Sequence, residues 1–274
     1  MIAEAWPLNA PYLVFTDLDG TLLDHHSYTA EPARPALARL AAMGALVVIA
    51  SSKTGSEIAR LTDELDLRGP VIAENGAVVN LPEHCPGREG IETATVRYDT
   101  IVALLAQLRE RNGFRFAGFH DLGSEQVAQL TGLTREAAQL ACQRQGSEPI
   151  LWQGSEVELQ RFSGLLAEQG LSLVRGGRFH HVLAADVDKA GAVVNMVTGL
   201  RACGWQGSTI GLGDAPNDHA MLGVVDYPVV VNNPDSPTMP PLQNPRILIT
   251  RQTGPAGWRE AIDTLLDKLQ GTQS

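Results

Sequence analysis

Short apolar runs alternate with segments of helical spacing in this chain, and the alternation constrains its fold more than any other feature. Tyr12–Thr16 and Ala45–Ala50 have the composition of buried strands, and Glu31–Met43, which lies between them, has the spacing of a helix. The alternation returns at Lys189 and continues to a last helical segment, Trp258–Leu269. Strands and helices of this length in alternation predict a parallel sheet with helices on both faces.

The pattern changes after Leu81. The stretch "PEHCPGREG" is rich in helix-breaking residues and is expected to be a linker. Further on, the strand-like runs "LSLV" and "RFHHVLA" are joined by "RGG", which predicts a hairpin and therefore an antiparallel sheet. We predict a Rossmann-like α/β core formed by residues 1–82 and 188–274, interrupted by an inserted α+β module of residues 83–187.

Composition and charge limit the classes of partner that the chain is expected to bind. The net charge of -10 argues against nucleic acid, but a small anionic substrate needs only a local positive cluster or a bound cation. Cys85, Cys142 and Cys203 show no metal spacing and are expected to be free thiols. No apolar run reaches about 20 residues, and "MIAEAWPLNAP" lacks the features of a signal peptide. We expect a cytoplasmic protein with no membrane partner, either a monomer or a small homo-oligomer.

Four clusters of polar residues stand where a strand pattern ends or a helix pattern begins. Ligands of open α/β sheets bind at the carboxyl ends of the strands, so these clusters are expected to face one site. In chain order they are Asp17 and Asp19; Ser51, Ser52 and Lys53; Lys189; and Asp214, Asn217 and Asp218.

The carboxylates of this set indicate a metal-assisted reaction at phosphorus. Several carboxylates at one sheet edge need a cation between them, and ligand sets made of oxygen suit Mg²⁺. Asp17, directly at the strand end, is expected to attack phosphorus and form an aspartyl-phosphate. Asp19, two residues further on, can protonate the leaving oxygen and later take a proton from water. Lys189, the hydroxyl of Ser51 and the Mg²⁺ would offset the charge of the transferring group.

The motifs "DLDGTLLD", "ASSKT", the lone Lys189 and "GLGDAPND" resemble, in the same order, the four motifs of the haloacid dehalogenase-like phosphatases. The resemblance implies that Asp17 is the nucleophile and Asp19 the general acid and base. It implies that Ser51 and Lys189 bind the phosphate. The Mg²⁺ ligands that it implies are Asp17, the backbone carbonyl of Asp19, and Asp214, with Asp218 in or next to the coordination shell. The inserted module resembles the α/β cap (C2B type) of the Cof-like branch of this superfamily.

A further set of segments is similar to the family of mannosyl-3-phosphoglycerate phosphatases: "SSKT", "ENGA", "RQGSEPILW" and "GGRFHHV". In that family the second motif ends in Ser-Lys, here Ser52 and Lys53, and the cap carries a Ser-Glu-Pro segment, here residues 147–149. Gly146 departs from the pattern, because an aromatic residue is expected at this position. The resemblance implies a glycosyl-3-phosphoglycerate substrate, which carries a carboxylate near its phosphate, with mannose as the sugar.

Eight residues are expected to contact this substrate: Ser52, Lys53, Asn75, Arg144, Ser147, Glu148, Arg178 and His180. Lys53, Arg144 or Arg178 would hold the carboxylate of the substrate, and Glu148 would accept hydrogen bonds from sugar hydroxyls. The alternative for the cap residues is structural: hairpin charges, a local salt bridge and a turn. His180 and His181 lie on opposite faces of their strand, so at most one of them points towards the site.

Three other functions share parts of this pattern. A sucrose-phosphate-type enzyme or another sugar phosphatase would use the whole catalytic set. A phosphomannomutase would share the first motif but would release no net phosphate. A non-catalytic binding protein on the same fold has no physical need for Asp17, Asp19, Lys189 and Asp214 together, which argues against it.

Overall fold

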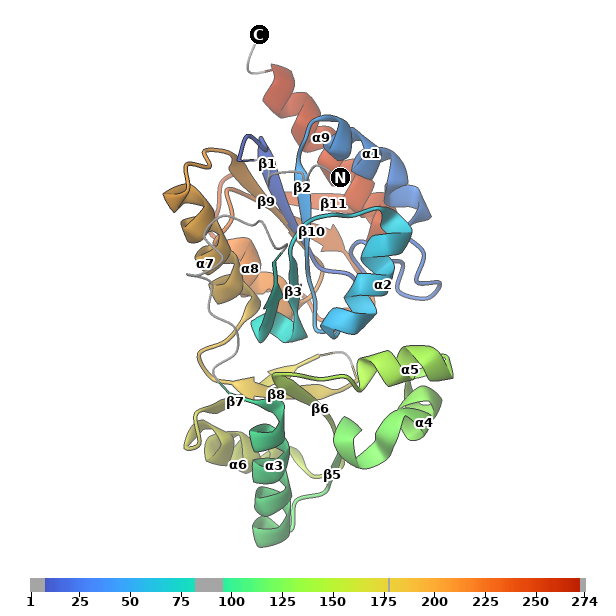
Figure 1. Ribbon diagram of the computed structural model, residues 1–274, viewed down its shortest axis with the longest axis vertical. Coiled ribbons are helices and arrows are strands. Elements are labelled where there is room, and N and C mark those ends of the chain that lie inside the picture. Colours follow the sequence, from blue (N-terminus) through green and yellow to red (C-terminus); the bar gives the residue numbers. More distant parts are fainter. Residues whose placement is uncertain (1–7, 82–95, 177, 272–274) are drawn as a thin grey trace, which may run out of the picture.

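The computed structural model describes residues 8–81, 96–176 and 178–271, which form two sheets with their helices (Figure 1). The larger sheet is built from residues on both sides of the segment that contains the smaller sheet. We call the part around the larger sheet the core and the part around the smaller sheet, Tyr98–Ala184, the cap. The predicted boundary at residues 82–83, the whole of the expected linker (residues 82–90), and Gly177 at the tip of the expected hairpin lie outside the described residues.

The core sheet is a mainly parallel sheet, as the sequence predicts. Its strands are β1 (Tyr12–Thr16), β2 (Leu46–Ala50), β3 (Val71–Ala73), β4 (Val78–Asn80), β9 (Ser208–Gly213), β10 (Tyr227–Asn232) and β11 (Leu248–Thr253). The spatial order is β11-β10-β9-β1-β2-β3-β4. The edge strand β4 pairs antiparallel with β3, and the other described pairings in this sheet are parallel. The first strand of the chain therefore lies in the middle of the sheet.

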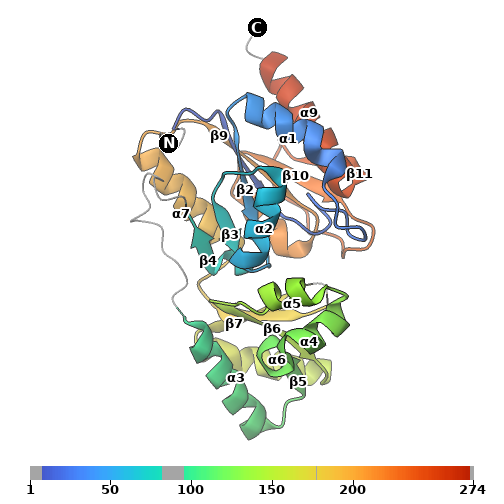
Figure 2. The same cartoon turned by 45° about the vertical axis from the view of Figure 1, so that its right-hand side comes forward.

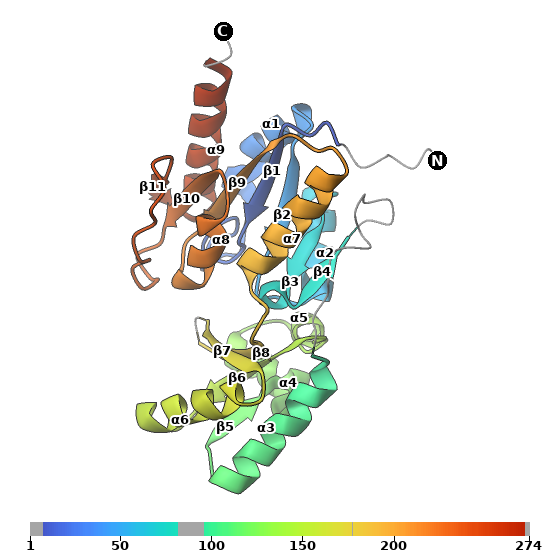
Figure 3. The same cartoon turned by 90° about the vertical axis from the view of Figure 1, so that its left-hand side faces the viewer.

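Helices cover both faces of the core sheet. They are α1 (Arg34–Ala42), α2 (Gly55–Leu65), α7 (Lys189–Ala202), α8 (His219–Gly223) and α9 (Gly254–Gly271), with the 3₁₀ turns η1 (Glu31–Ala33), η2 (Glu74–Gly76) and η4 (Pro216–Asp218). On one face α1, α2 and α9 bury Leu37, Ile58 and Trp258, and on the other α7 and α8 bury Met196 and Leu222. Figure 3 shows α7 and α8 in front of the sheet. Among the described helices, none combines the length and apolar character that a bilayer crossing requires.

The cap is a four-stranded sheet with helices. Its elements are α3 (Tyr98–Asn112), β5 (Phe116–Gly118), α4 (Phe119–Thr131), α5 (Arg135–Ala141), β6 (Ser147–Trp152), α6 (Glu156–Ala167), β7 (Leu171–Arg175) and β8 (His180–Ala184). The strands pair antiparallel in the order β5-β6-β8-β7, which includes the predicted hairpin of β7 and β8. Helices α3 and α6 pack on the face away from the core, and α5 lies next to α2 (Figures 1 and 2). The opposite face of the cap sheet points towards the core.

Side-chain caps determine where two core helices begin. At the start of α2, the hydroxyl of Thr54 accepts from the amide of Glu57 at 3.1 Å, and the Glu57 carboxylate accepts from the amide of Thr54 at 2.9 Å. At the start of α7, the Asp188 carboxylate accepts from the amide of Gly191 at 2.6 Å. Both helices begin at the sheet edge that faces the cap (Figure 1).

Candidate active site

The ends of β1 and β9 bring the first and last motifs together. These strands are parallel neighbours with Thr16 beside Leu212, so Asp17 and Asp214 follow them at the same edge of the sheet. The amide of Asp17 donates to the carbonyl oxygen of Leu212 at 2.9 Å, which continues the ladder for one more residue. Two side chains that are 197 positions apart in the sequence thus start from adjacent backbone.

Asp17, Asp214 and Asp218 form a compact group of buried carboxylates. One oxygen from each residue lies within 4.8 Å of the others. Lys189 pairs with two of them, Asp17 and Asp218, so three ionised carboxylates would share one ammonium group in a buried space and leave an excess of negative charge. Such an excess is unfavourable without a further cation. A hard divalent cation such as Mg²⁺ fits this set of oxygen donors, and these three residues would hold it.

Asp214 is held in place through both of its oxygens. The hydroxyl of Thr21 donates to one oxygen at 2.7 Å, and the side-chain amide of Asn233 donates to the other at 2.6 Å. Burial, followed by the nearby charge of Asp218, raises the pKa of Asp214 to about 6, although the two donors act in the opposite direction. Burial thus disfavours the ionised form of Asp214, and a cation bound to this fixed carboxylate would stabilise that form.

Lys189 is a buried ammonium group between two of these carboxylates. Its Nζ lies 2.7 Å from Asp17 Oδ1 and 2.7 Å from Asp218 Oδ1. Burial by itself would lower the pKa of Lys189, but the two carboxylates outweigh this effect and raise it, so the group is charged. The other oxygen of Asp218 accepts from the amides of Asp214 and Ala215, at 3.2 and 3.3 Å. Asp218 therefore fixes the ammonium group in position beside Asp17.

Asp17 is supported from behind by two buried side chains. The hydroxyl of Thr16 donates to the carbonyl oxygen of Asp17 at 2.8 Å, and the indole of Trp258 donates to the Thr16 hydroxyl at 3.0 Å. Burial is the main cause that raises the pKa of the Asp17 carboxyl, and the charge of Lys189 opposes it. The backbone of the predicted nucleophile is thus held rigidly, and one of its carboxylate oxygens contacts a positive charge.

Asp19 is paired with Lys53 at the same edge. Asp19 Oδ2 lies 2.9 Å from Lys53 Nζ, and both side chains are partly exposed. Gly20 follows in the left-handed conformation, with φ of 82°, and a Cβ atom there would lie 2.7 Å from Asp214 Oδ2. The turn therefore requires glycine, both for its backbone angle and for the space next to Asp214. The expected role of the Asp19 carbonyl oxygen as a metal ligand stays a prediction.

The turn after β2 and the turn η2 are joined by backbone hydrogen bonds. The amide of Asn75 donates to the carbonyl of Ser51, and the amide of Glu74 donates to the carbonyl of Lys53, both at 2.9 Å. The buried Ser51 hydroxyl accepts from the amide of Lys53 at 3.3 Å, and Ser52 is partly exposed. Because β2 is the neighbour of β1, these predicted phosphate and substrate residues lie at the edge that carries the carboxylates.

Two of the predicted cap residues contact the core. Arg144 Nη1 donates to the carbonyl oxygen of Ser52 at 3.0 Å. The amide and the hydroxyl of Ser147 both donate to the carboxylate of Glu74 at 2.8 Å. Arg144 and Ser147 are buried between the cap and the core.

Glu148 and Arg178 have their partners inside the cap. Glu148 accepts from the Tyr98 hydroxyl at 2.9 Å and from the amide of His120 at 2.8 Å, and burial raises its pKa. Arg178 donates to the carbonyl oxygens of Leu130 and Thr131, at 2.7 and 3.1 Å, at the end of α4. The structure therefore does not join these two residues to the carboxylate group of the core.

The two histidines of β8 lie on opposite faces of their strand, as their spacing requires. His180 shares a face with Val182, which packs in the cap interior with the residues of α3 and α6. His181 lies on the other face, where its Nδ1 is 3.4 Å from Arg144 Nη2. Burial, followed by the charge of Arg144, lowers the pKa of His181 to about 3, so this imidazole is neutral. The predicted residue His180 thus lies away from Arg144, and its neighbour lies beside it.

Three residues of this region were missed by sequence reasoning: Thr21, Glu74 and Asn233. Thr21 could have been found, because it lies inside the first motif, four positions after Asp17. Glu74 belongs to the segment "ENGA", but no local sequence pattern indicates its contacts with the cap. Asn233 had only its position just after a strand to indicate a role.

Comparisons with known proteins agree with the fold. Residues 14–129 match the family described as haloacid dehalogenase-like hydrolase, a range that contains Asp17, Asp19 and the turn at Ser51. A solved haloacid dehalogenase-like hydrolase from Bacteroides thetaiotaomicron is similar over 93% of this chain and 99% of its own, with 20% sequence identity and a TM-score of 0.64.

Two phosphatases also share the fold. A sugar phosphatase of HAD subclass IIB is similar over 94% of this chain and 99% of its own, with 17% identity and a TM-score of 0.64. The sucrose-phosphatase from Synechocystis, solved with sucrose and phosphate, is similar over 93% and 98%, with 14% identity and a TM-score of 0.63. The chain therefore has the fold of the haloacid dehalogenase-like hydrolases and, in residues 14–129, their sequence pattern.

Proposed function

We propose that the protein is a Mg²⁺-dependent phosphatase of phosphorylated sugar derivatives that works through an aspartyl-phosphate on Asp17. The main support is that the Asp17 carboxylate lies beside the charged Lys189, within a carboxylate group that fits a divalent cation. The fold supports the substrate class, because it is shared with a sugar phosphatase and a sucrose-phosphatase.

The proposed reaction has two halves. A carboxylate oxygen of Asp17 first attacks the phosphorus atom, and the bond between phosphorus and the ester oxygen of the substrate breaks; in a glycosyl-3-phosphoglycerate this is the oxygen on C3 of the glycerate. Asp19 gives its proton to that oxygen, so the first product leaves as an alcohol. The ionised Asp19 then takes a proton from a water molecule, whose oxygen attacks the same phosphorus atom. Phosphate leaves, and the Asp17 carboxylate is restored.

Other residues of the chain have supporting roles in this proposal. We assign to Lys189 the neutralisation of charge on the phosphoryl oxygens, since its ammonium group is fixed beside Asp17. We assign to Ser51 and Asn75, which are joined by a backbone hydrogen bond, the binding of phosphate and substrate oxygens. Mg²⁺, when bound by the carboxylate group, would supply additional charge compensation.

For the substrate itself, we propose a glycosyl-3-phosphoglycerate, and mannosyl-3-phosphoglycerate is the leading candidate. The segments "SSKT", "ENGA", "RQGSEPILW" and "GGRFHHV" support this assignment. Such a substrate carries a carboxylate near its phosphate and needs a second cation besides Lys189. Lys53, which lies next to Asp19, and Arg144, which contacts the turn at Ser52, are the cations that support it.

A phosphate-release screen tests the proposal. The panel contains mannosyl-3-phosphoglycerate, glucosyl-3-phosphoglycerate, sucrose 6-phosphate and simple hexose phosphates, with a reaction without enzyme as the blank. We expect release from the mannosyl compound, lost with EDTA and restored by Mg²⁺. Release from sucrose 6-phosphate alone would favour a sucrose-phosphate-type enzyme, and isomerisation without free phosphate would favour a mutase. No turnover of any compound in the presence of Mg²⁺ would contradict the proposal.

A further inference from the structure

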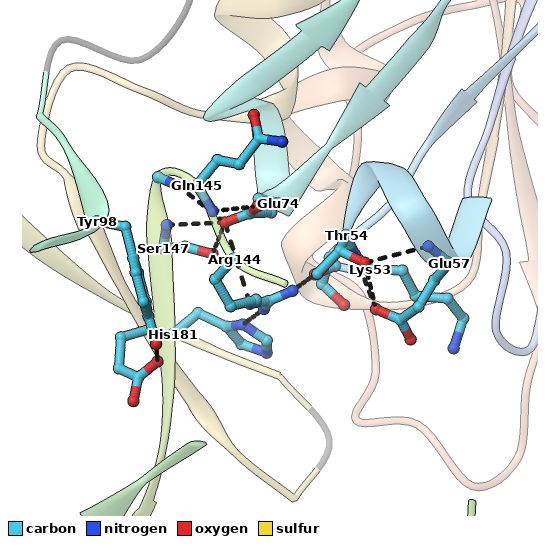
Figure 4. Close-up of polar contacts among 12 residues, drawn as sticks. Lys53, Thr54, Glu57, Glu74, Tyr98, Arg144, Gln145, Ser147 and His181 are labelled. Carbon is cyan, nitrogen blue, oxygen red and sulfur yellow. Dashed lines mark hydrogen bonds and ion pairs between the residues drawn. The ribbon is translucent and has the colours of Figure 1, made fainter. Parts of the chain in front are cut away.

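We propose that Glu74 is a positioning residue whose carboxylate locks the cap onto the core above the predicted phosphate site. The inference rests on the proposed function, because it makes the locked cap responsible for holding the sugar part of the substrate. Figure 4 shows Glu74 extending from the core to the cap backbone next to Arg144, Gln145 and Ser147.

The Glu74 carboxylate is fully buried, and consecutive backbone amides of the cap bind it. The amide of Gln145 donates to Oε1 at 2.8 Å, and those of Gly146 and Ser147 donate to Oε2 at 3.1 and 2.8 Å. The Ser147 hydroxyl adds a fourth hydrogen bond at 2.8 Å. Successive amides that converge in this way form an anion-binding nest. Here the nest belongs to the cap and the anion belongs to the core, so the contact is charge-assisted.

The backbone that carries Glu74 has a conformation that residues with side chains rarely adopt. The φ angles of Glu74 and Asn75 are 52° and 58°, in the left-handed region. Glutamate has no special tolerance for this region, unlike glycine or asparagine. Such strain persists only where the surrounding structure holds it, and it is frequent at functional positions. The strained turn directs the Glu74 side chain out of the core.

The same turn also supports the predicted phosphate-binding residues. Its amides bind the carbonyls of Ser51 and Lys53, both at 2.9 Å. On its other side, Gly76 packs so closely against the carbonyl of Asp188 that a Cβ atom would collide with it. Asp188 immediately precedes Lys189. The backbone of this turn, which Glu74→Gln leaves in place, thus contacts the segments of both groups that are expected to hold the phosphate, while the Glu74 side chain contacts the cap.

Two further contacts hold the cap at this point. Arg144 donates to the carbonyl oxygen of Ser52, and its Nε lies 4.0 Å from Glu74 Oε2, so its charge balances the buried carboxylate. The hydroxyl of Thr54 donates to the carbonyl oxygen of Leu140 at 2.9 Å. Figure 4 shows that Arg144 lies between Glu74 and the neutral ring of His181. Glu74 provides more of the hydrogen bonds between cap and core than either of these residues.

Glu74→Gln tests the lock, since glutamine has nearly the same size but carries no charge and replaces one acceptor oxygen with a donor. Amide hydrogen exchange of the segment 145–147 and small-angle scattering measure cap docking directly. We expect exchange in this segment to become at least roughly tenfold faster, and the radius of gyration to increase. Asp121→Asn is the matched control: it makes the same chemical change inside the cap, where Asp121 pairs with Arg109 and accepts from the amide of Gly118. It should leave both readouts at the wild-type value.

Kinetics then separates a positioning role from a structural one. For Glu74→Gln we expect KM for the phosphorylated sugar to rise about tenfold, and kcat/KM for p-nitrophenyl phosphate, which offers the cap no sugar, to stay within about twofold. Unchanged exchange and scattering, faster exchange throughout cap and core, or an equal loss with both substrates would each overturn the inference. A wild-type protein without phosphatase activity would refute the proposed function instead, and exchange and scattering would still decide whether Glu74 locks the cap.

Discussion

The ammonium nitrogen of Lys189 lies 2.7 Å from a carboxylate oxygen of Asp17, and both side chains are almost completely buried. Charges at this distance interact strongly, because buried surroundings screen them much less than water does. The contact opposes, but does not cancel, the effect of burial, which raises the pKa of Asp17 well above its usual range. A carboxylate that is to attack phosphorus must be ionised, and Lys189 favours that form.

Replacing Asp17 by asparagine is expected to abolish turnover while the fold persists. The amide is nearly isosteric with the carboxylate but has no anionic oxygen for the attack on phosphorus. We expect kcat to fall by at least about 10³-fold in a phosphate-release assay, with unchanged circular dichroism. A variant that keeps even a tenth of the wild-type rate would show that Asp17 is not the nucleophile.

Replacing Lys189 by methionine should destabilise the metal-free protein strongly. The change leaves Asp17 and Asp218 buried without their common counter-charge, and losing one partner of a buried pair costs about 3–5 kcal/mol. Urea unfolding measures the difference, and Mg²⁺ should restore part of it by supplying positive charge. Lys53→Met is the comparison, because its pair with Asp19 is partly exposed and should contribute only about 0–1 kcal/mol. Equal losses in the two variants would contradict this interpretation.

The core and its carboxylates could be predicted because the signals are local. Apolar runs and helical spacing indicate strands and helices in alternation, and parallel strands place their carboxyl ends at one edge. Asp17, Lys189 and Asp214 therefore meet there although they are distant in the sequence. The order of the strands, with β1 between β9 and β2, is not visible in the sequence and required the structure.

The cap residues could not be assigned in the same way. Alternation along a strand shows which side chains share a face, but not which face points towards the core. His180 is the predicted contact, whereas His181 is the one that lies beside Arg144. The contact of Glu74 with Gln145 spans 71 positions and depends on how the cap docks, which no local pattern records.

The affinity for Mg²⁺ should fall in acid. Burial raises the pKa of Asp214 to about 6, so in the metal-free protein this carboxyl takes up a proton as the pH falls through that value. Mg²⁺ must then displace this proton, together with any proton on Asp17, whose pKa burial also raises, and its affinity is expected to drop at least about tenfold per pH unit below the pKa of Asp214. Calorimetric titrations at about pH 5 and about pH 8 measure the affinity and, in two buffers, the protons released. An affinity that does not change over this range would rule out Asp214 as a ligand with a raised pKa.

Gly20→Ala is expected to weaken metal binding beyond its effect on stability. The new Cβ atom would meet Asp214 Oδ2 and Asn233 Nδ2, each at 2.7 Å, and the φ of 82° is unfavourable for alanine. The matched control is Gly132→Ala, whose φ of 79° imposes a similar backbone strain but whose Cβ would meet nothing within 4 Å. Both variants should lose about 1–3 kcal/mol of stability in urea unfolding. Only Gly20→Ala should lose Mg²⁺ affinity, by about tenfold or more. A displaced Asp214 would no longer place its oxygen close enough to those of Asp17 and Asp218 to bind the same ion. Equal Mg²⁺ affinities for the two variants would contradict this prediction. They would mean that glycine is needed at position 20 for its backbone angle only, and not for the space beside Asp214.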